Sequence, residues 1–178
     1  MLEIDNTTLL VIDIQGKLAS LMQDKERLYD NTARMLRAAD VLGLDVICTE
    51  QYPDGLGATV DEVGEHLNVQ PIPKLTFSCC GEEAFPTTLK QTGCTQVLVA
   101  GIETHICVYQ TVRDLLADGY EVYVLSDAVS SRTEANRQLG LDRMKDAGAV
   151  LTSVEMALFE MLKIAKGDQF KQIARIVK

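Results

Sequence analysis

Cys107 lies where a thiol can become reactive. The apolar run Val97–Ala100 predicts a strand that ends at Gly101, and the next helix is predicted to begin near Thr104. Unpaired N–H groups and the positive end of the helix dipole favour a thiolate in the first turn of such a helix. The Thr104 hydroxyl is a candidate N-cap that accepts from the N–H of Cys107. The alternative is a small buried hydrophobe, the common state of a free cysteine.

Asp13 and Lys74 carry the charges that a reactive thiol needs. Asp13 ends the predicted first strand in LLVIDIQ and is either a helix N-cap or a catalytic carboxylate at the ligand-binding edge of the sheet. Lys74 follows two prolines in PIPKLTFS, which restrict the backbone. It is either a solvated lysine or a cation that favours a thiolate and neutralises an oxyanion. Gln15 is a candidate to position Asp13 or a substrate.

No histidine is placed to act as the base for Cys107. His66 and His105, the two histidines of the chain, are far apart and lack an i,i+4 partner, which argues against a metal site. His105 is two residues from Cys107, and helix neighbours at that spacing do not face each other. The base that takes the thiol proton is therefore expected to be a carboxylate, and Asp13 is the candidate.

Several common ligand-binding and nucleophile motifs are absent from the chain. There is no G-x-G-x-x-G after the first predicted strand and no G-x-x-x-x-G-K-[ST], so the usual phosphate cradles of dinucleotides and nucleoside triphosphates are missing. The G-x-S-x-G turn of serine α/β-hydrolases is missing as well. We therefore expect chemistry without a cofactor.

The composition predicts a soluble globular protein of the cytosol. The 178 residues suit a single domain over residues 1–178, and the net charge of −9 disfavours nucleic acid and anionic membranes as partners. No apolar run reaches the ~20 residues of a membrane span, and MLEIDNTT does not resemble a secretory signal. The five cysteines are odd in number and lack a C-x-x-C pair, which indicates reduced thiols. The adjacent Cys79 and Cys80 are either redox-active or, as we favour, an ordinary loop pair.

Strand-like and helical segments alternate along the chain, which predicts βαβ units and a parallel sheet. We expect strands at Thr8–Ile14, Leu44–Thr49, Gln96–Ala100, Tyr120–Ser126 and Val150–Thr152. We expect helices at Lys25–Leu42, Val60–His66, Glu83–Thr92, Thr104–Asp118, Thr133–Ala147, Ser153–Ile164 and Asp168–Val177. The irregular segment Glu50–Pro73 is rich in proline and glycine and is expected to cover the site.

Together these residues resemble the isochorismatase-like cysteine hydrolases. Asp13 in IDIQ, Lys74 in KLTFS and Cys107 in GIETHICV carry the resemblance, which covers almost the whole chain. The segments TEQYPDGLGATVDEVG, DAVSSR and QFKQI are similar to the isochorismatase domain-containing subgroup.

The resemblance implies a fold and a mechanism. The fold is a three-layer α/β/α sandwich around a mainly parallel, Rossmann-like six-stranded sheet. The site is a catalytic triad of Asp13, Lys74 and Cys107, in which the thiolate attacks an amide carbonyl and water later hydrolyses the thioester. A non-proline cis peptide between Ile102 and Glu103 holds the N–H groups of Glu103 and Cys107 as an oxyanion hole. The resemblance also implies a homo-oligomer with closed symmetry.

One departure from the family bears on the substrate. Nicotinamidases of this superfamily carry a D-x-H metal motif after the second strand, whereas this chain has Glu50, Gln51 and Tyr52 there. We therefore expect a metal-independent amidohydrolase for a small molecule, with Gln15, Gln51, Tyr52 and Phe77 as candidate substrate-binding residues. Two alternatives stay open: an isochorismatase-type vinyl-ether hydrolase that does not need the cysteine, and a catalytically idle binding or scaffold protein.

Overall fold

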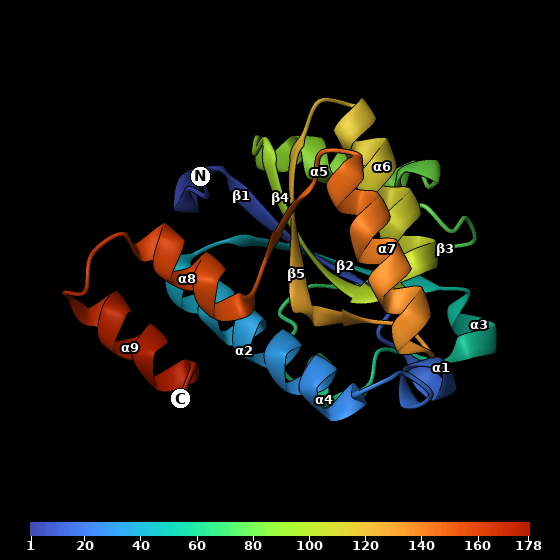
Figure 1. The fold of residues 1–178 in the computed structure, drawn as a ribbon, viewed down its shortest axis with the longest axis horizontal. Coiled ribbons are helices and arrows are strands. Elements are labelled where there is room, and N and C mark those ends of the chain that lie inside the picture. Colours follow the sequence, from blue (N-terminus) through green and yellow to red (C-terminus); the bar gives the residue numbers. More distant parts are fainter.

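A computed structural model describes residues 1–178 as a six-stranded, wholly parallel sheet with helices on both faces (Figure 1). In chain order the strands are β1 (Thr7–Ile12), β2 (Asp45–Gln51), β3 (Ile72–Lys74), β4 (Gln96–Ile102), β5 (Glu121–Ser130) and β6 (Val150–Thr152). Their order across the sheet is β3-β2-β1-β4-β5-β6. The three-layer fold predicted from the sequence is confirmed.

The helices connect the strands and cover the sheet. They are α1 (Gly16–Ser20), α2 (Lys25–Leu42), α3 (Pro53–Leu56), α4 (Asp61–Gly64), α5 (Ala84–Thr92), α6 (Tyr109–Ala117), α7 (Glu134–Asp146), α8 (Val154–Leu162) and α9 (Asp168–Ile176). Short 3-10 turns occupy Ile4–Asn6 and Cys79–Gly81, and a π-helical turn occupies Thr104–Val108. No helix combines the length and apolar composition needed to span a membrane.

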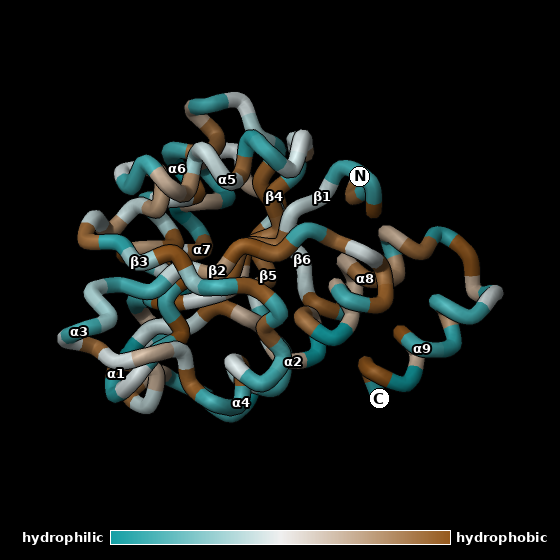
Figure 2. Tube along the Cα trace, turned by 180° about the vertical axis from the view of Figure 1, so that it is seen from behind, coloured by the Kyte–Doolittle hydropathy of each residue, from teal (hydrophilic) through white to brown (hydrophobic).

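Two hydrophobic cores, one on each face of the sheet, hold the layers together. On one face, α2, α8 and α9 pack through side chains such as Met35, Leu158 and Ile173. On the other face, α5, α6 and α7 pack through side chains such as Leu89 and Leu115. Every residue of the central strands β1 and β4 is buried, because helices cover both of their faces (Figure 2).

Helix α2 shows how closely local sequence can define an element. It spans Lys25–Leu42, as predicted, and buries a face that includes Leu28 and Met35. Gly43 ends it with φ +73°, in the left-handed conformation that glycine adopts most readily. The predicted helix boundaries are confirmed.

Several predicted boundaries near the edge of the sheet are wrong. Strand β1 ends at Ile12 rather than Ile14, because Asp13 has φ +54° and leaves the extended conformation. The predicted helix Thr104–Asp118 is a π-helical turn followed by α6. Strand β5 continues four residues beyond the predicted Ser126, to Ser130.

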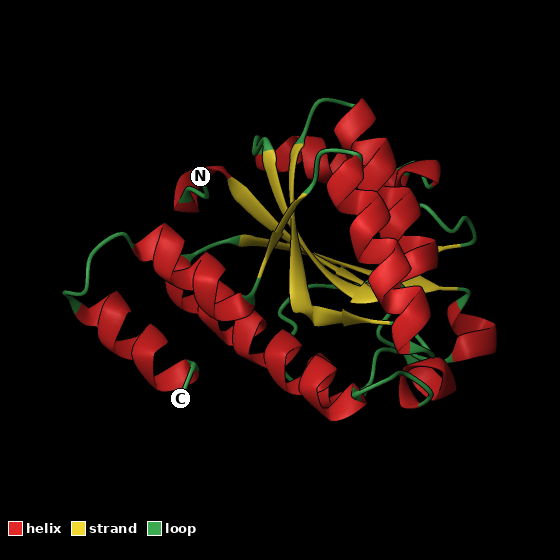
Figure 3. Ribbon diagram, in the orientation of Figure 1, coloured by secondary structure: helices red, strands yellow, loops and turns green.

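The carboxyl ends of the strands lie along one edge of the sheet, where the arrowheads meet in Figure 3. Ile12 of β1 pairs with Thr49 of β2 on one side and with Gly101 of β4 on the other. Gly101 has φ +134°, and a Cβ there would lie 2.2 Å from the carbonyl oxygen of Ile12. Only glycine therefore lets β4 approach β1 this closely.

Candidate active site

Asp13 is buried at the carboxyl end of β1. Its side chain is 2% exposed, and its backbone N–H donates to the Thr49 carbonyl over 3.1 Å. The positive φ turns the chain out of β1 at this residue. The N-cap alternative is wrong, because α1 is preceded by Gln15 and has no side-chain cap.

Lys74 is the last residue of β3, and its side chain is fully buried. Its ammonium nitrogen lies 2.7 Å from Oδ2 of Asp13. Nζ donates to Oε1 of Gln51 over 2.7 Å and to the carbonyls of Thr76 and Phe77 over 3.0 and 3.1 Å. The solvated-lysine alternative is therefore wrong, and Lys74 forms a buried ion pair with Asp13.

The two oxygens of the Asp13 carboxylate have different surroundings. Oδ1 accepts a hydrogen bond of 2.8 Å from the Thr49 hydroxyl. Oδ2 lies 2.7 Å from Nζ of Lys74 but has no aligned hydrogen-bond donor, while Nζ donates to Gln51 and to two loop carbonyls. The carboxylate thus keeps one oxygen, Oδ2, that faces the Lys74 charge with no donor aligned on it.

Cys107 lies in the π-helical turn Thr104–Val108 and is almost fully buried. The Glu103 carbonyl accepts from the N–H groups of Ile106 and Val108 and skips that of Cys107. The Cys107 N–H is thus not bound to the carbonyl that an α-helix would give it. The predicted N-cap is wrong: Thr104 is already inside the turn, and its buried hydroxyl has no partner.

The charges of Asp13 and Lys74 both act on the Cys107 thiol, with opposite effects. Burial, followed by the negative charge of Asp13, raises the pKa of the Cys107 thiol to about 12, although Lys74 opposes this shift. Burial and the neighbouring carboxylate therefore disfavour a resting thiolate, in contrast to the expectation from the helix terminus. A buried anion beside a carboxylate is unfavourable.

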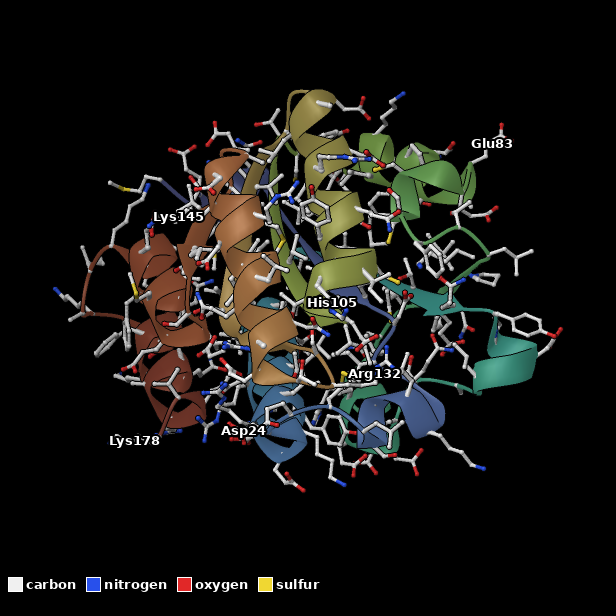
Figure 4. All side chains as sticks on the ribbon, turned by 45° about the vertical axis from the view of Figure 1, so that its right-hand side comes forward. Asp24, Glu83, His105, Arg132, Lys145 and Lys178 are labelled. Atoms are coloured by element: carbon white, nitrogen blue, oxygen red, sulfur yellow. The ribbon has the colours of Figure 1, made fainter.

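The backbone around the thiol is fixed from several sides. The peptide bond Ile102–Glu103 is cis, as expected from the resemblance. The buried Glu103 carboxylate accepts from the backbone N–H and from Nε of Arg132, over 3.1 and 3.0 Å. Figure 4 shows Arg132 and His105 in the same region, and Nδ1 of His105 lies 3.0 Å from the Ser131 hydroxyl. The end of β5 therefore holds the turn at two points.

Helix α7 closes the far side of the same turn. A Cβ at Gly140 would lie 2.8 Å from the carbonyl oxygen of Thr104. This close approach requires glycine and leaves the turn little room to move.

Gln15 and Gln51 are held in place by hydrogen bonds rather than free for a ligand. The fully buried Gln15 amide donates to the carbonyls of Gln51 and Gly57 and accepts from the Gln51 N–H. The Gln51 amide donates to the Leu75 carbonyl and accepts from Lys74. Gln15 therefore joins the end of β2 to the loop at Gly57, and Gln51 positions the lysine.

Tyr52 and Phe77 are exposed, at 53% and 56%, on the loops on either side of Lys74. Tyr52 lines a shallow pocket of about 290 Å³ beside this lysine, together with Pro53, Asp54, Pro73, Leu75 and Glu82. Phe77 contributes its carbonyl to the Lys74 ammonium. These two are the predicted substrate-binding residues with accessible side chains.

Other features of the structure lie outside this arrangement. Glu50, at the position of the family's metal motif, accepts from the N–H and the hydroxyl of Thr59. A cavity of about 450 Å³ lies between α5 and the end of α6, and none of Asp13, Lys74 and Cys107 lines it. All five cysteines are free.

The sequence did not predict the contacts that the side chains of Thr49, Glu103, Ser131 and Arg132 make at this site. Thr49 gives no local signal, because its hydroxyl contacts Asp13 across two strands. The segment DAVSSR contributed to the resemblance, yet nothing in it indicated that its last residue binds Glu103.

Comparison with known proteins identifies relatives along nearly the whole chain. The family model for the isochorismatase domain matches residues 7–156. The secreted isochorismatase effector Isc1 of Phytophthora sojae is 38% identical over 97% of this chain and 85% of its own length. Isochorismatase domain-containing protein 2 of Danio rerio is 37% identical over 96% of this chain and 86% of its own.

Solved structures share the fold. MAR1 ribonuclease from Caenorhabditis elegans superposes with a TM-score of 0.92 at 35% identity, covering 99% of this chain and 91% of its own. Two YcaC proteins also give 0.92 at 26% identity. That of Pseudomonas aeruginosa, described with hexane-2,5-diol and covalent acrylamide, covers 99% of this chain and 89% of its own. That of Escherichia coli, described as an octameric hydrolase of unknown specificity, covers 98% and 88%. With its domain match, its close relatives and its fold, this chain belongs to the isochorismatase family.

Proposed function

We propose that this chain is a cysteine hydrolase that cleaves a C–N bond of a small amide or related acyl compound through a thioester, without a metal ion. The observation that carries the proposal is the buried Asp13–Lys74 ion pair, 2.7 Å between Oδ2 and Nζ, acting on the Cys107 thiol. A neutral thiol next to a carboxylate with a free oxygen is suited to nucleophilic attack with proton transfer to that oxygen.

The reaction proceeds in two halves. Sγ of Cys107 attacks the carbonyl carbon while its proton passes to Oδ2 of Asp13. The tetrahedral intermediate collapses to a thioester, and Asp13 gives that proton to the leaving amine. Water then attacks the thioester, giving one proton to Asp13 and releasing the acid, and the proton returns to Sγ.

Lys74 and the nucleophile turn stabilise charge in this scheme. The Lys74 ammonium balances the buried carboxylate in the resting enzyme and balances the oxyanion when Asp13 is protonated. The N–H groups of Glu103 and Cys107 form the oxyanion hole. The Glu103 carbonyl leaves the Cys107 N–H unused, which supports this role.

The relatives bear on this proposal in two ways. Acrylamide is an electrophile, so the covalent acrylamide of the P. aeruginosa relative is consistent with a nucleophile in that protein. The E. coli relative is an octamer. We extend both features to this chain: Cys107 is its nucleophile, and the single domain of residues 1–178 forms a homo-oligomer with closed symmetry.

An RNA substrate is the rival activity, because the C. elegans relative is named a ribonuclease. The net charge of −9 disfavours it, since phosphate backbones bind proteins through positive charge. No observation on this chain favours it over acyl chemistry.

The test is a screen of small primary amides for ammonia release, with the wild type, Cys107→Ala and Cys94→Ala compared on each hit. Cys94 is a matched control, since it is buried but lines the cavity between α5 and α6. We expect Cys107→Ala to lower turnover by roughly 10³-fold or more and Cys94→Ala to retain it. Mass spectrometry of the quenched wild type should find an acyl group on Cys107.

Other outcomes contradict the proposal in distinct ways. Hydrolysis of isochorismate that survives Cys107→Ala but not Asp13→Asn would favour the vinyl-ether alternative. RNA cleavage by the wild type without amide turnover would favour the rival activity. No turnover of any of these, with an unreactive Cys107, would favour the idle scaffold.

A further inference from the structure

We propose that Thr49 and Cys79 form a hydrogen-bond relay that selects Oδ2 of Asp13 as the oxygen that takes the Cys107 proton. Both are positioning residues, since they act through Asp13. The inference rests on the proposed function, and it assigns a role to the fully buried Cys79, which the reaction itself does not use.

The contacts form a continuous chain. The Thr49 hydroxyl donates to Oδ1 of Asp13 over 2.8 Å, and the same hydroxyl oxygen lies 3.7 Å from Sγ of Cys79. The Cys79 N–H donates to the Thr111 hydroxyl over 2.9 Å, which fixes the far end of the chain on α6. All of these residues are buried, so water does not replace the bonds.

The direction of the relay follows from the number of hydrogens. A threonine hydroxyl has one hydrogen, and at Thr49 the carboxylate oxygen takes it. The 3.7 Å contact is therefore a bond donated by the Cys79 thiol to the Thr49 oxygen. Burial raises the pKa of the Cys79 thiol to about 11, so the thiol keeps the hydrogen that it donates.

As a consequence, the two oxygens of the Asp13 carboxylate are not equivalent. Oδ1 is held by Thr49, whereas Oδ2 faces the Lys74 charge without an aligned donor. The groups that face Asp13 are Thr49 from β2, Lys74 from β3, Cys79 from its 3-10 turn and Cys107 from the π-helical turn. The Asp13 charge also acts on the Cys48 thiol of β2. The Cys79 thiol donates its hydrogen to Thr49, whereas the Cys107 thiol is the nucleophile whose proton passes to Oδ2 during attack.

The test measures alkylation of Cys107 by iodoacetamide as a function of pH, by mass spectrometry, in the wild type, Thr49→Val and Thr49→Ser. Valine keeps the shape of threonine without the hydroxyl, and serine restores the donor. Removal of the donor disfavours the charged Asp13 carboxylate. On a plot of alkylation rate against pH, the fall in rate toward acid pH, called here the acid limb, should therefore lie about one pH unit higher. At pH values within that limb, alkylation should slow about tenfold. Thr49→Ser should return the limb to its wild-type position.

Two further variants keep the result interpretable. Thr32→Val removes another fully buried threonine hydroxyl, which bonds the Leu28 carbonyl within α2, and should leave the profile unchanged. Cys79→Ala should shift the limb in the same direction as Thr49→Val but by less, and it serves as the test if Thr49→Val does not fold. The relay would be overturned if the folded Thr49→Val protein showed an unshifted acid limb. If Thr49→Val does not fold, an unshifted limb in Cys79→Ala would overturn it instead. Failure of Thr49→Ser to restore the wild-type profile would also overturn it.

The assay needs no natural substrate, so the relay and the proposed function fail separately. A shifted alkylation profile without turnover of any amide would retain the relay and overturn the hydrolase. Amide turnover through Cys107 with an unshifted profile would do the reverse.

Discussion

The change Lys74→Met tests whether the buried ion pair holds the site together. Methionine fills much of the space of the lysine stem but leaves the Asp13 carboxylate, 2% exposed, without its cation at 2.7 Å. Gln51 and the carbonyls of Thr76 and Phe77 also lose their donor. Removal of one partner of a buried pair costs about 3–5 kcal/mol of unfolding free energy, because the other charge stays buried and unpaired.

The assay is urea unfolding at pH 7 followed by circular dichroism. The matched control is Lys171→Met, because Lys171 and Asp168 form a pair 3.2 Å apart on the surface of α9. An exposed pair of this kind contributes less than about 1 kcal/mol. The double variant Asp13→Asn, Lys74→Met removes both charges and should lose several kcal/mol less than the two single losses added together.

Two results would refute this reasoning. If Lys74→Met and Lys171→Met lose the same unfolding free energy within error, the buried pair is not a main stabilising contact of the strand ends. Alternatively, the double variant would lose the full sum of the single effects, and the two charges would then be energetically independent despite their 2.7 Å separation.

Three more changes test other parts of the structure. Gly101→Ala should cost more than about 3 kcal/mol of unfolding free energy or prevent folding, because its Cβ would lie 2.2 Å from the Ile12 carbonyl oxygen. The control Gly43→Ala has positive φ but nothing within 4 Å of its Cβ, and it should cost about 1 kcal/mol. Equal losses of Tm in the two variants would contradict this. Gln15→Ala should lower urea stability by about 2–4 kcal/mol, since it removes three hydrogen bonds that the fully buried Gln15 amide makes to backbone groups of Gln51 and Gly57. A loss of activity without a loss of stability would instead restore its predicted substrate role. Burial raises the pKa of the Cys48 thiol from 9.0 to about 12, so the unfolded chain loses this proton first and stability falls as pH rises above 9. Cys48→Ala should remove about 1.4 kcal/mol of the loss of unfolding free energy between pH 8 and 10. Equal slopes of unfolding free energy against pH in the wild type and the variant would refute this.

The parts of the fold that were predicted correctly are those whose cause is local. Helix α2 follows from an apolar period of 3.6 residues and a glycine after its last turn, and both lie within its own sequence. Strand β3 is not among the strands expected from the sequence, because three residues that include a proline carry no period. Its pairing with β2, opposite Gln51, is what makes it a strand.

The parts of the site that were predicted wrongly depend on contacts distant in sequence. The π-helical turn arises because the Glu103 carbonyl accepts from Ile106 and Val108, a choice that no residue type in THICV specifies. The expectation of a thiolate at Cys107 depends on a feature of the same kind. The helix terminus is visible in the sequence, but the burial of the thiol and its distance from Asp13 are not.

The neutral thiol explains why a carboxylate, rather than a histidine, suits this site as the base. In the resting site Asp13 and Lys74 balance each other, and burial beside Asp13 raises the pKa of Cys107 to about 12, so no unbalanced charge is buried. When Sγ attacks, its proton neutralises Asp13 and the negative charge moves to the oxyanion, still opposite Lys74. The net charge of the site is therefore constant throughout the proposed reaction, and the desolvation penalty that an unbalanced buried thiolate would incur does not arise. A neutral imidazole in place of Asp13 would leave the Lys74 charge unbalanced at rest, and proton transfer to it would add a second buried cation.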